Sequence, residues 1–251
     1  MLSIAILSKN EEENLKELLP SLSFAQEILI IDAHSYDQTV EVAKKHGARV
    51  ISSSDPSFSN RRNKAMHEAR NNWVLFIDAD ERLSQELINE IQNVVHKNND
   101  FSYRIPRIDV FWGQDVKFGE VWKARTKGIM RLVKKGSGEW RGDVHEEYIS
   151  HIPVLTMQYQ LKHYSHASIA DFLTSVNEFS TLKAKELYFN GHRATFLHIA
   201  LYPCTKFLYT YFILLGFLDG AAGFVYSFMM SFHSFLVMSK LYLLQNKNTS
   251  Y

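Results

Sequence analysis

The stretch Trp73-Val74-Leu75-Phe76-Ile77-Asp78-Ala79-Asp80-Glu81-Arg82 decides the fold class of this chain. It begins with a continuous apolar run, which is typical of a strand in a parallel sheet that is covered on both faces. Acidic residues follow the run directly. Ligands of open α/β sheets bind beyond the carboxyl ends of the strands, so this is where a functional site is expected first.

Three more short apolar runs, at residues 3–7, 27–32 and 48–51, precede this stretch. Polar segments with helical spacing separate them, and another such segment follows Arg82. Asn10 and Ser35, each with Glu or Gln three residues later, are predicted to cap the first two helices. Alternating strands and helices predict an α/β fold with a mostly parallel sheet and flanking helices.

Composition excludes several classes of protein. The chain has 251 residues, of which 46% are hydrophobic and 22% charged, so it can bury a sizeable core and is neither a disordered chain nor a linker. A net charge of +1 gives no reason to expect nucleic-acid binding. The single cysteine, Cys204, excludes an internal disulfide and a Cys-rich zinc site, and we expect it to be buried. No signal peptide is recognisable at the start, which predicts a cytoplasmic protein.

The acids after the apolar runs predict a metal site. Strand alternation would place Asp78 and Asp80 on one face, and Asp32 ends an earlier strand. Two converging carboxylates suit Mg²⁺ or Mn²⁺, which bind one or two carboxylates together with substrate phosphates. Arg62, in the segment Arg61-Arg62-Asn63, would add to a phosphate-binding rim. The alternative is that these are surface acids and a solvated helix start.

Several strings together resemble family 2 glycosyltransferases of the GT-A fold. The matching strings are Ile6-Leu7-Ser8-Lys9-Asn10-Glu11-Glu12, Ile31-Asp32-Ala33-His34-Ser35-Tyr36-Asp37-Gln38-Thr39, Arg62-Asn63 and the stretch that begins at Trp73. Further strings resemble the subfamily of bacterial lipopolysaccharide-core glucosyltransferases: Met130-Arg131-Leu132, Trp140, Val144-His145-Glu146 and Leu161-Lys162-His163-Tyr164-Ser165. The chain departs from that subfamily at Trp122-Lys123-Ala124-Arg125, where an acid is expected after the Trp.

The resemblance implies a nucleotide-sugar donor and assigns residues to it. The residues expected around the base and ribose are Ser8, Asn10, Glu12 and Asp32. Asp78 is expected at the ribose and the metal, Asp80 at the metal, and Arg62 and Arg131 near the diphosphate. His163 could complete the metal sphere, with His166 as a weaker candidate.

Inverting glycosyl transfer needs one carboxylate that takes the proton of the acceptor hydroxyl. The resemblance places this base at Glu146, with Glu147 as the second choice and Asp143 as the third. A retaining double displacement would instead need a carboxylate nucleophile beneath the sugar. The residues alone do not distinguish the two reactions.

The C-terminal part is aromatic and nearly uncharged. Residues 207–218 and 220–239 are uncharged runs on either side of Asp219, and they predict helices. Three roles are open for them: attachment to a membrane interface, an oligomer or packing interface, and a true membrane span. We therefore expect a GT-A catalytic domain over residues 1–165 and a helical region over residues 166–251.

The resemblance implies a metal-dependent, inverting transfer of a hexose, with UDP-glucose as the expected donor. The resemblance suggests a saccharide or glycolipid acceptor of the bacterial envelope, and hence a place on the inner face of the cytoplasmic membrane. One alternative is a sugar nucleotidyltransferase, although Ser8-Lys9-Asn10-Glu11-Glu12 lacks the glycines of a phosphate loop. Another is a non-catalytic, membrane-associated protein that binds nucleotide sugars.

Overall fold

The computed structural model describes residues 1–142, 146–164 and 168–247. The chain divides into two compact units: unit 1 comprises residues 1–107 and 124–163, and unit 2 comprises residues 108–123 and 164–251. The chain leaves unit 1 for the last time after residue 163, close to the predicted domain boundary at residue 165. Residues 108–123, however, were expected in the catalytic domain and instead belong to unit 2.

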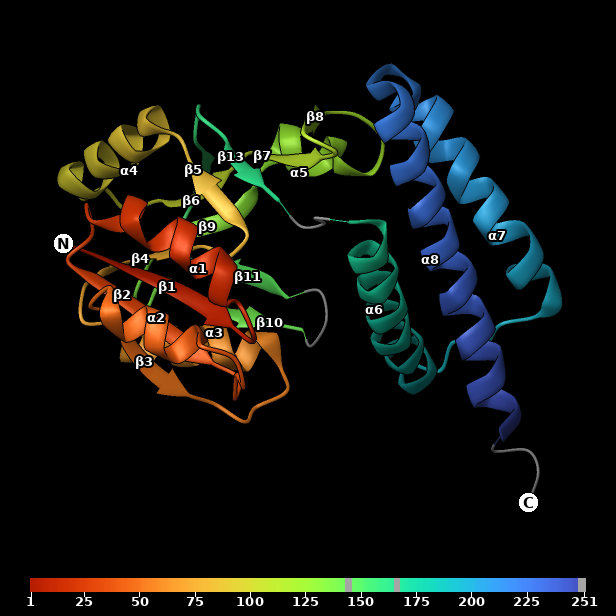
Figure 1. The fold of residues 1–251 in the computed structure, drawn as a ribbon, viewed down its shortest axis with the longest axis horizontal. Helices are drawn as coiled ribbons and strands as arrows, with labels where there is room; N and C mark the ends of the chain where they lie inside the picture. Colours follow the sequence, from red (N-terminus) through yellow and green to blue (C-terminus); the bar gives the residue numbers. More distant parts are fainter. Residues whose placement is uncertain (143–145, 165–167, 248–251) are drawn as a thin grey trace. The chain divides into compact units, whose positions relative to one another are not determined.

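Unit 1 is built around a large α/β sheet (Figure 1). Not all strands of unit 1 belong to this sheet. The strands of the unit are β1 (Leu2–Ser8), β2 (Glu27–Asp32), β3 (Arg49–Ser52), β4 (Trp73–Phe76), β5 (Glu81–Leu83), β6 (Ser102–Ile105), β9 (Ile129–Lys134), β10 (Gly138–Arg141), β11 (Glu147–Ser150), β12 (Val154–Thr156) and β13 (Leu161–His163). Its helices are α1 (Glu12–Leu18), the 3-10 turn η1 (Leu19–Leu22), α2 (Thr39–Lys45), α3 (Phe58–Glu68) and α4 (Gln85–Lys97). Helix α5 (Trp122–Lys127) begins in unit 2 and ends in unit 1.

The strand order confirms the α/β class predicted from the sequence. Among the described residues the main sheet has seven strands in the order β12-β6-β9-β4-β1-β2-β3. Strands β4, β1, β2 and β3 are mutually parallel, as expected, and β9 runs antiparallel to β4 and β6. The carboxyl ends of β1, β2 and β4 therefore meet at one edge of the sheet, which positions the site described below.

Alternating side chains of the strands build two cores. On one face, Ile4 and Ile6 of β1 pack with apolar residues of α1, α2 and α4. On the other face, Ala5 of β1 and Phe76 of β4 pack with α3 and with Trp140 of β10. Strand β4 is buried along its whole length, which explains its unbroken apolar sequence.

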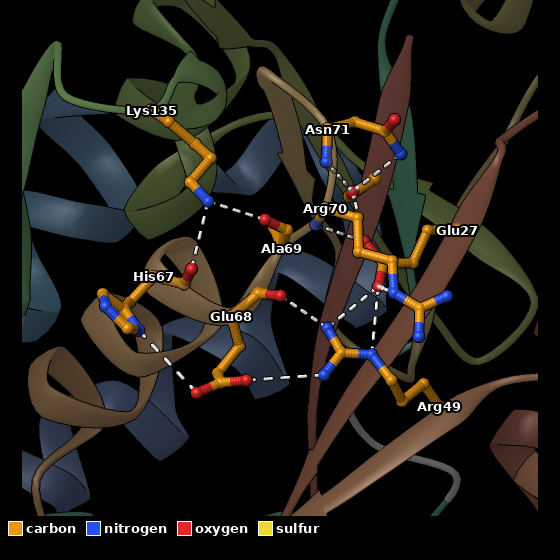
Figure 2. A network of polar contacts seen from close by, with 9 residues as sticks. Glu27, Arg49, His67, Glu68, Ala69, Arg70, Asn71 and Lys135 are labelled. Atoms are coloured by element: carbon orange, nitrogen blue, oxygen red, sulfur yellow. Dashed lines mark hydrogen bonds and ion pairs between the residues drawn. The ribbon is translucent and has the colours of Figure 1, made fainter.

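A polar network closes the amino end of the same sheet (Figure 2). Glu27, the first residue of β2, accepts hydrogen bonds from the Ser3 hydroxyl at 2.5 Å, the Arg70 amide at 2.7 Å and the Arg49 guanidinium at 2.9 Å. The backbone amide of Asn71 donates to Ser3 Oγ at 3.2 Å. These contacts tie β1, β2 and β3 to the connection between α3 and β4.

Unit 2 is mostly helical. It contains most of β7 (Arg107–Phe111), β8 (Gln114–Val116), the 3-10 turn η2 (Gly119–Val121), α6 (Ile169–Phe189), α7 (Phe196–Leu208), the π-helical turn η3 (Tyr209–Ile213), the 3-10 turn η4 (Gly216–Asp219) and α8 (Gly220–Lys247). Its main core joins Phe111 to Phe172 of α6 and Tyr226 of α8. The Tyr226 hydroxyl donates to Asp109 at 2.9 Å, and Asp219 accepts from the amides of Lys117 and Phe118.

One segment of unit 2, Gly216–Asn246, is long and apolar enough to cross a membrane by length and composition, with a mean hydropathy of 1.4. Helix α8 nevertheless packs against both α6 and α7. Cys204, expected to be buried, is exposed, because α7 buries none of its own residues.

Candidate active site

The loops after β1 and β2 hold each other through hydrogen bonds. Asn10 has a left-handed backbone with φ of 59°. Its backbone amide donates to Ser35 Oγ at 2.8 Å, and its side-chain Oδ1 accepts from the backbone amide of Tyr36 at 3.0 Å. Asn10 and Ser35 therefore join two loops and do not cap helices as predicted, since the N-cap residues of α1 and α2 are Glu11 and Gln38.

The remaining residues predicted to surround the nucleotide lie at the same edge. Asp32 ends β2 and is 3% exposed. Its carboxylate accepts from the hydroxyls of Ser8 at 3.1 Å and Ser35 at 2.5 Å, and from the Ser35 amide at 3.0 Å. Glu12 accepts from the Gln38 amide at 3.2 Å. The structure thus brings Ser8, Asn10, Glu12 and Asp32 together at the carboxyl ends of β1 and β2.

The acids after β4 lie in a turn. Strand β4 ends at Phe76, and the Glu81 amide donates to the Asp78 carbonyl at 3.0 Å. Side-chain alternation applies only within a strand, so it does not place Asp78 and Asp80 on one face. The two carboxylates contact different side chains: Arg62 and Arg131 contact Asp78, and His163 contacts Asp80.

Asp78 is held by two arginines. Arg62 Nη2 donates to its Oδ1 at 3.1 Å, and Arg131 Nη2 donates to its Oδ2. Burial alone would raise the pKa of Asp78, but the charges of Arg131 and Arg62 hold that pKa well below its usual range. Asp78 is therefore an ionised carboxylate that two arginines fix.

Arg131 was expected to face the diphosphate. Its side chain is 5% exposed and bridges Asp78 to Glu81, whose carboxylate lies 2.5 Å from Nη2. Glu81 also accepts the Asp78 amide at 3.0 Å. Burial raises the pKa of Glu81, the charge of Arg131 opposes the shift, and Asp78 adds to it. Through its Nη2 atom, Arg131 contacts both acids and so fixes the turn after β4.

Asp80 faces a histidine from a neighbouring strand. His163 ends β13, which pairs with β5, and its Nε2 lies 3.3 Å from Asp80 Oδ2. Adjacent ligands of an octahedral ion at about 2.0–2.1 Å lie about 3.0 Å apart, so this pair fits two positions around Mn²⁺ or Mg²⁺. Within residues 1–142, 146–164 and 168–247 there is no cluster of three or more His, Cys, Asp or Glu residues that could hold a metal. A diphosphate and water would have to supply the other ligands.

Glu146, the predicted base, lies in the same site. Its Oε1 accepts from Arg62 Nε at 2.8 Å, and its side chain is 15% exposed. The Arg62 guanidinium lies over the Trp140 ring at 4.9 Å, which fixes its position. Glu147 is the exposed first residue of β11. The other two candidates, Asp143 and His166, lie outside the described residues.

Sequence reasoning missed two acids in this region. Glu81 is fully buried, and the signal for it was a charged residue, Arg131, inside the apolar strand β9, which requires a buried counter-ion. Glu11 is the second: burial raises its pKa, a hydrogen bond from Asn14 opposes this, and the charge of Asp80 raises it further. Glu11 follows Asn10 in the loop after β1, and its backbone amide donates to Thr39 Oγ1 at 2.8 Å, so it lies beside the interlocked loops of the candidate site.

Comparison with known proteins identifies the family. The model of glycosyl transferase family 2 matches residues 3–142. The chain belongs to this family. Both the predicted resemblance and the expected glycosyltransferase activity are thereby confirmed, and with the sheet order they confirm the GT-A class.

Relatives match along almost the whole chain. An uncharacterized glycosyltransferase of Rickettsia typhi is 30% identical over 96% of this chain and 86% of its own length. The lipopolysaccharide core biosynthesis glycosyltransferase LpsC of Rhizobium meliloti is 26% identical over 96% of this chain and 92% of its own. The crystal structure of S. aureus TarS 1-349 in complex with UDP-GlcNAc is also similar. The match covers 99% of this chain and 87% of the TarS chain, with 16% identity and a TM-score of 0.49.

Proposed function

We propose that this family 2 glycosyltransferase transfers a hexose from a UDP-sugar, with glucose as the expected sugar, by a metal-dependent, inverting displacement. One observation supports this above the others: Asp80 and His163, from separate segments, face each other at 3.3 Å beside the residues predicted for the nucleotide. A bound Mn²⁺ or Mg²⁺ would offset the charge of the departing diphosphate. Asp80 and His163 would hold it, and the donor nucleotide would lie against the loops after β1 and β2.

Glu146 would act as the base. In an inverting reaction the acceptor hydroxyl attacks the anomeric carbon as its proton passes to a carboxylate, and the bond to the diphosphate breaks. Arg62 contacts both Glu146 and Asp78, so it orients the base relative to the turn after β4. We assign Arg62 a positioning role for this reason.

The acceptor is proposed to be a saccharide or glycolipid of the bacterial envelope, such as lipopolysaccharide core. Support comes from the relative LpsC, whose name places it in lipopolysaccharide core biosynthesis. An acceptor linked to lipid would place the enzyme on the inner face of the cytoplasmic membrane, where residence raises the local acceptor concentration. Exposed apolar residues along α7 support this location.

The metal assignment is tested with Asp80→Ala. We expect Mn²⁺ to strengthen UDP binding by the unchanged protein and to have no effect on binding by the variant. Transfer from UDP-glucose should fall by about 100-fold or more, because an ion contributes several kcal/mol to such a transition state. Asp100→Ala, which removes a highly exposed carboxylate, is the control. Equal Mn²⁺ effects on Asp80→Ala and the unchanged protein would contradict the assignment.

The base assignment is tested by a matched pair, Glu146→Gln and Glu147→Gln. Glu146→Gln should bind UDP-glucose with unchanged affinity and lose about 10²- to 10⁴-fold in transfer rate. Glu147→Gln should retain the rate, because the Glu147 side chain is exposed at the start of β11. Calorimetry measures donor binding, and release of UDP measures transfer. The reverse outcome would move the role to Glu147.

A further inference from the structure

Helix α7 presents an apolar face that no described residue of its own unit covers. Leu197, Leu201, Cys204 and Leu208 share one face by helical spacing. The three leucines are 65%, 57% and 53% exposed, and Cys204 is exposed as well. A contiguous apolar face of this kind marks an interaction site in a folded protein.

Helix α8 has a different role, although it has the length to span a membrane. It lies between α6 and α7 (Figure 1). Its Lys240 ammonium donates to Asn177, Ser180 and Thr181 of α6. A lysine satisfied in this way fixes α8 to α6, so α8 serves as the support of the unit and α7 as its exposed surface.

A hollow of about 410 Å³ lies among these three helices. Its lining comes from the end of α6, the connection between α6 and α7, the start of α7 and the second half of α8. It consists of Lys183, Leu187, His192, Arg193, His198, Tyr202, His233, Ser234, Val237, Met238 and Leu241. Among the described residues this lining includes no carboxylate. It therefore combines basic and imidazole groups with an apolar wall.

The polar groups of the hollow suit a phosphate. Arg193 provides a permanent positive charge, and imidazoles donate hydrogen bonds even when neutral. His198 Nδ1 accepts the Thr195 amide at 3.0 Å, so a neutral His198 ring has its proton on Nε2. Lys183 is partly neutralised, since Glu186 lies 2.9 Å from its ammonium. Arg193 is therefore the principal unneutralised charge of the lining.

We propose that this hollow binds the phosphate headgroup of an anionic membrane lipid, while the exposed face of α7 lies in the membrane interface. The proposal deepens the membrane location given above and rests on that location, not on the glycosyl-transfer chemistry. Phe189 and Phe196 lie two residues from members of the lining and are 82% and 74% exposed, so they would enter the same membrane interface.

Charge favours a lipid surface over a second copy of the chain. Residues 187–251 contain one acid, Asp219, against four Lys and Arg residues. Asp219 is already used by the amides of Lys117 and Phe118. Lys206 of this segment is paired with Glu120 at 2.7 Å and Lys240 is held by α6, which leaves Arg193 as the cation at the hollow. A symmetric dimer through α7 would supply Arg193 with no carboxylate, because α7 contains none, whereas an anionic membrane complements it.

Flotation with vesicles tests the proposal in the full-length protein. Three compositions are compared: phosphatidylcholine alone, phosphatidylcholine with phosphatidylglycerol, and phosphatidylcholine with enough oleate to give the same negative charge. We expect the strongest binding with phosphatidylglycerol. Arg193→Ala should weaken that binding about fivefold, the effect of one basic residue at an anionic surface. Lys185→Ala, which removes one exposed charge of the same helical unit outside the hollow, should change it less than twofold.

The sole cysteine reports on α7 directly. A polarity-sensitive dye on Cys204 should shift to shorter wavelength when phosphatidylglycerol vesicles are added. Equal losses in Arg193→Ala and Lys185→Ala, equal binding to oleate vesicles, or a dye that stays in water would overturn the proposal. So would a dimer whose formation shields the dye without lipid, or binding of inorganic phosphate with no preference for vesicles. UDP release measured with the same proteins reports separately on the proposed function.

Discussion

Arg131 shows how one buried residue organises the turn after β4. It lies on the apolar strand β9, and its guanidinium bridges Asp78 and Glu81. Glu81 in turn accepts the Asp78 amide. Arg131 and Arg62 together fix the Asp78 side chain, while Asp80 contacts His163.

Arg131→Met is expected to lower the free energy of unfolding by about 3–5 kcal/mol, because it leaves two carboxylates without their common cation. Urea unfolding at pH 7 measures the change. The double variant Arg131→Met/Glu81→Gln removes the Glu81 carboxylate that has lost its cation, whereas Asp78 keeps Arg62, so it should be more stable than Arg131→Met alone. Equal stability of the single and double variants would show that Glu81 does not depend on Arg131.

At the scale of elements, opposite ends of the same strands serve different purposes. The carboxyl ends of β1 and β2 continue into the interlocked loops of the site, where Asn10 joins Ser35. The amino end of β2 begins with Glu27, whose carboxylate collects donors from three other segments (Figure 2). Burial by itself would raise the pKa of Glu27, but hydrogen bonds from Ser3, the Arg70 amide and Arg49 outweigh it and lower that pKa.

This shift predicts the pH dependence of the Glu27 contribution. Because the pKa is lowered by folding, the contribution is present above the ordinary value of 4.5 and is lost as pH falls through the lower folded-state pKa. Glu27→Gln should therefore cost about 1–3 kcal/mol at pH 7 and flatten the loss of stability below pH 4.5. Denaturant unfolding between pH 7 and pH 3 measures both effects. Glu17→Gln, at an exposed carboxylate, should leave the acid limb unchanged.

At the scale of the whole molecule, residues 108–123 depart from unit 1 in the middle of its sequence and fold with unit 2. Phe111, Val116 and Val121 of this segment pack with Phe172 and other residues of α6 and α8. The catalytic unit therefore cannot be separated from the helices by one cut in the chain.

A chain shortened to residues 1–163 is expected to aggregate, because it exposes Phe111, Val116 and Val121. Light scattering and gel filtration measure this. Replacing these three residues with Ser in the shortened chain should restore a monomer. A monomeric shortened chain without those replacements would mean that the segment folds without its helical partners.

The order of strands and helices up to residue 97, the parallel α/β core and the location of the candidate site at the strand ends could be predicted from the sequence. They follow from local periodicity and from the way strand ends meet in a parallel sheet. The strands between residues 102 and 163 were not predicted. The partners of individual side chains could not. Asp78 and Asp80 look equivalent in sequence, and only β9 and β13, more than 50 residues downstream, give the first an arginine and the second a histidine. Likewise α7 and α8 are similarly apolar, and only packing against α6 decides which of them is covered, since burial depends on contacts between segments that are distant in the chain.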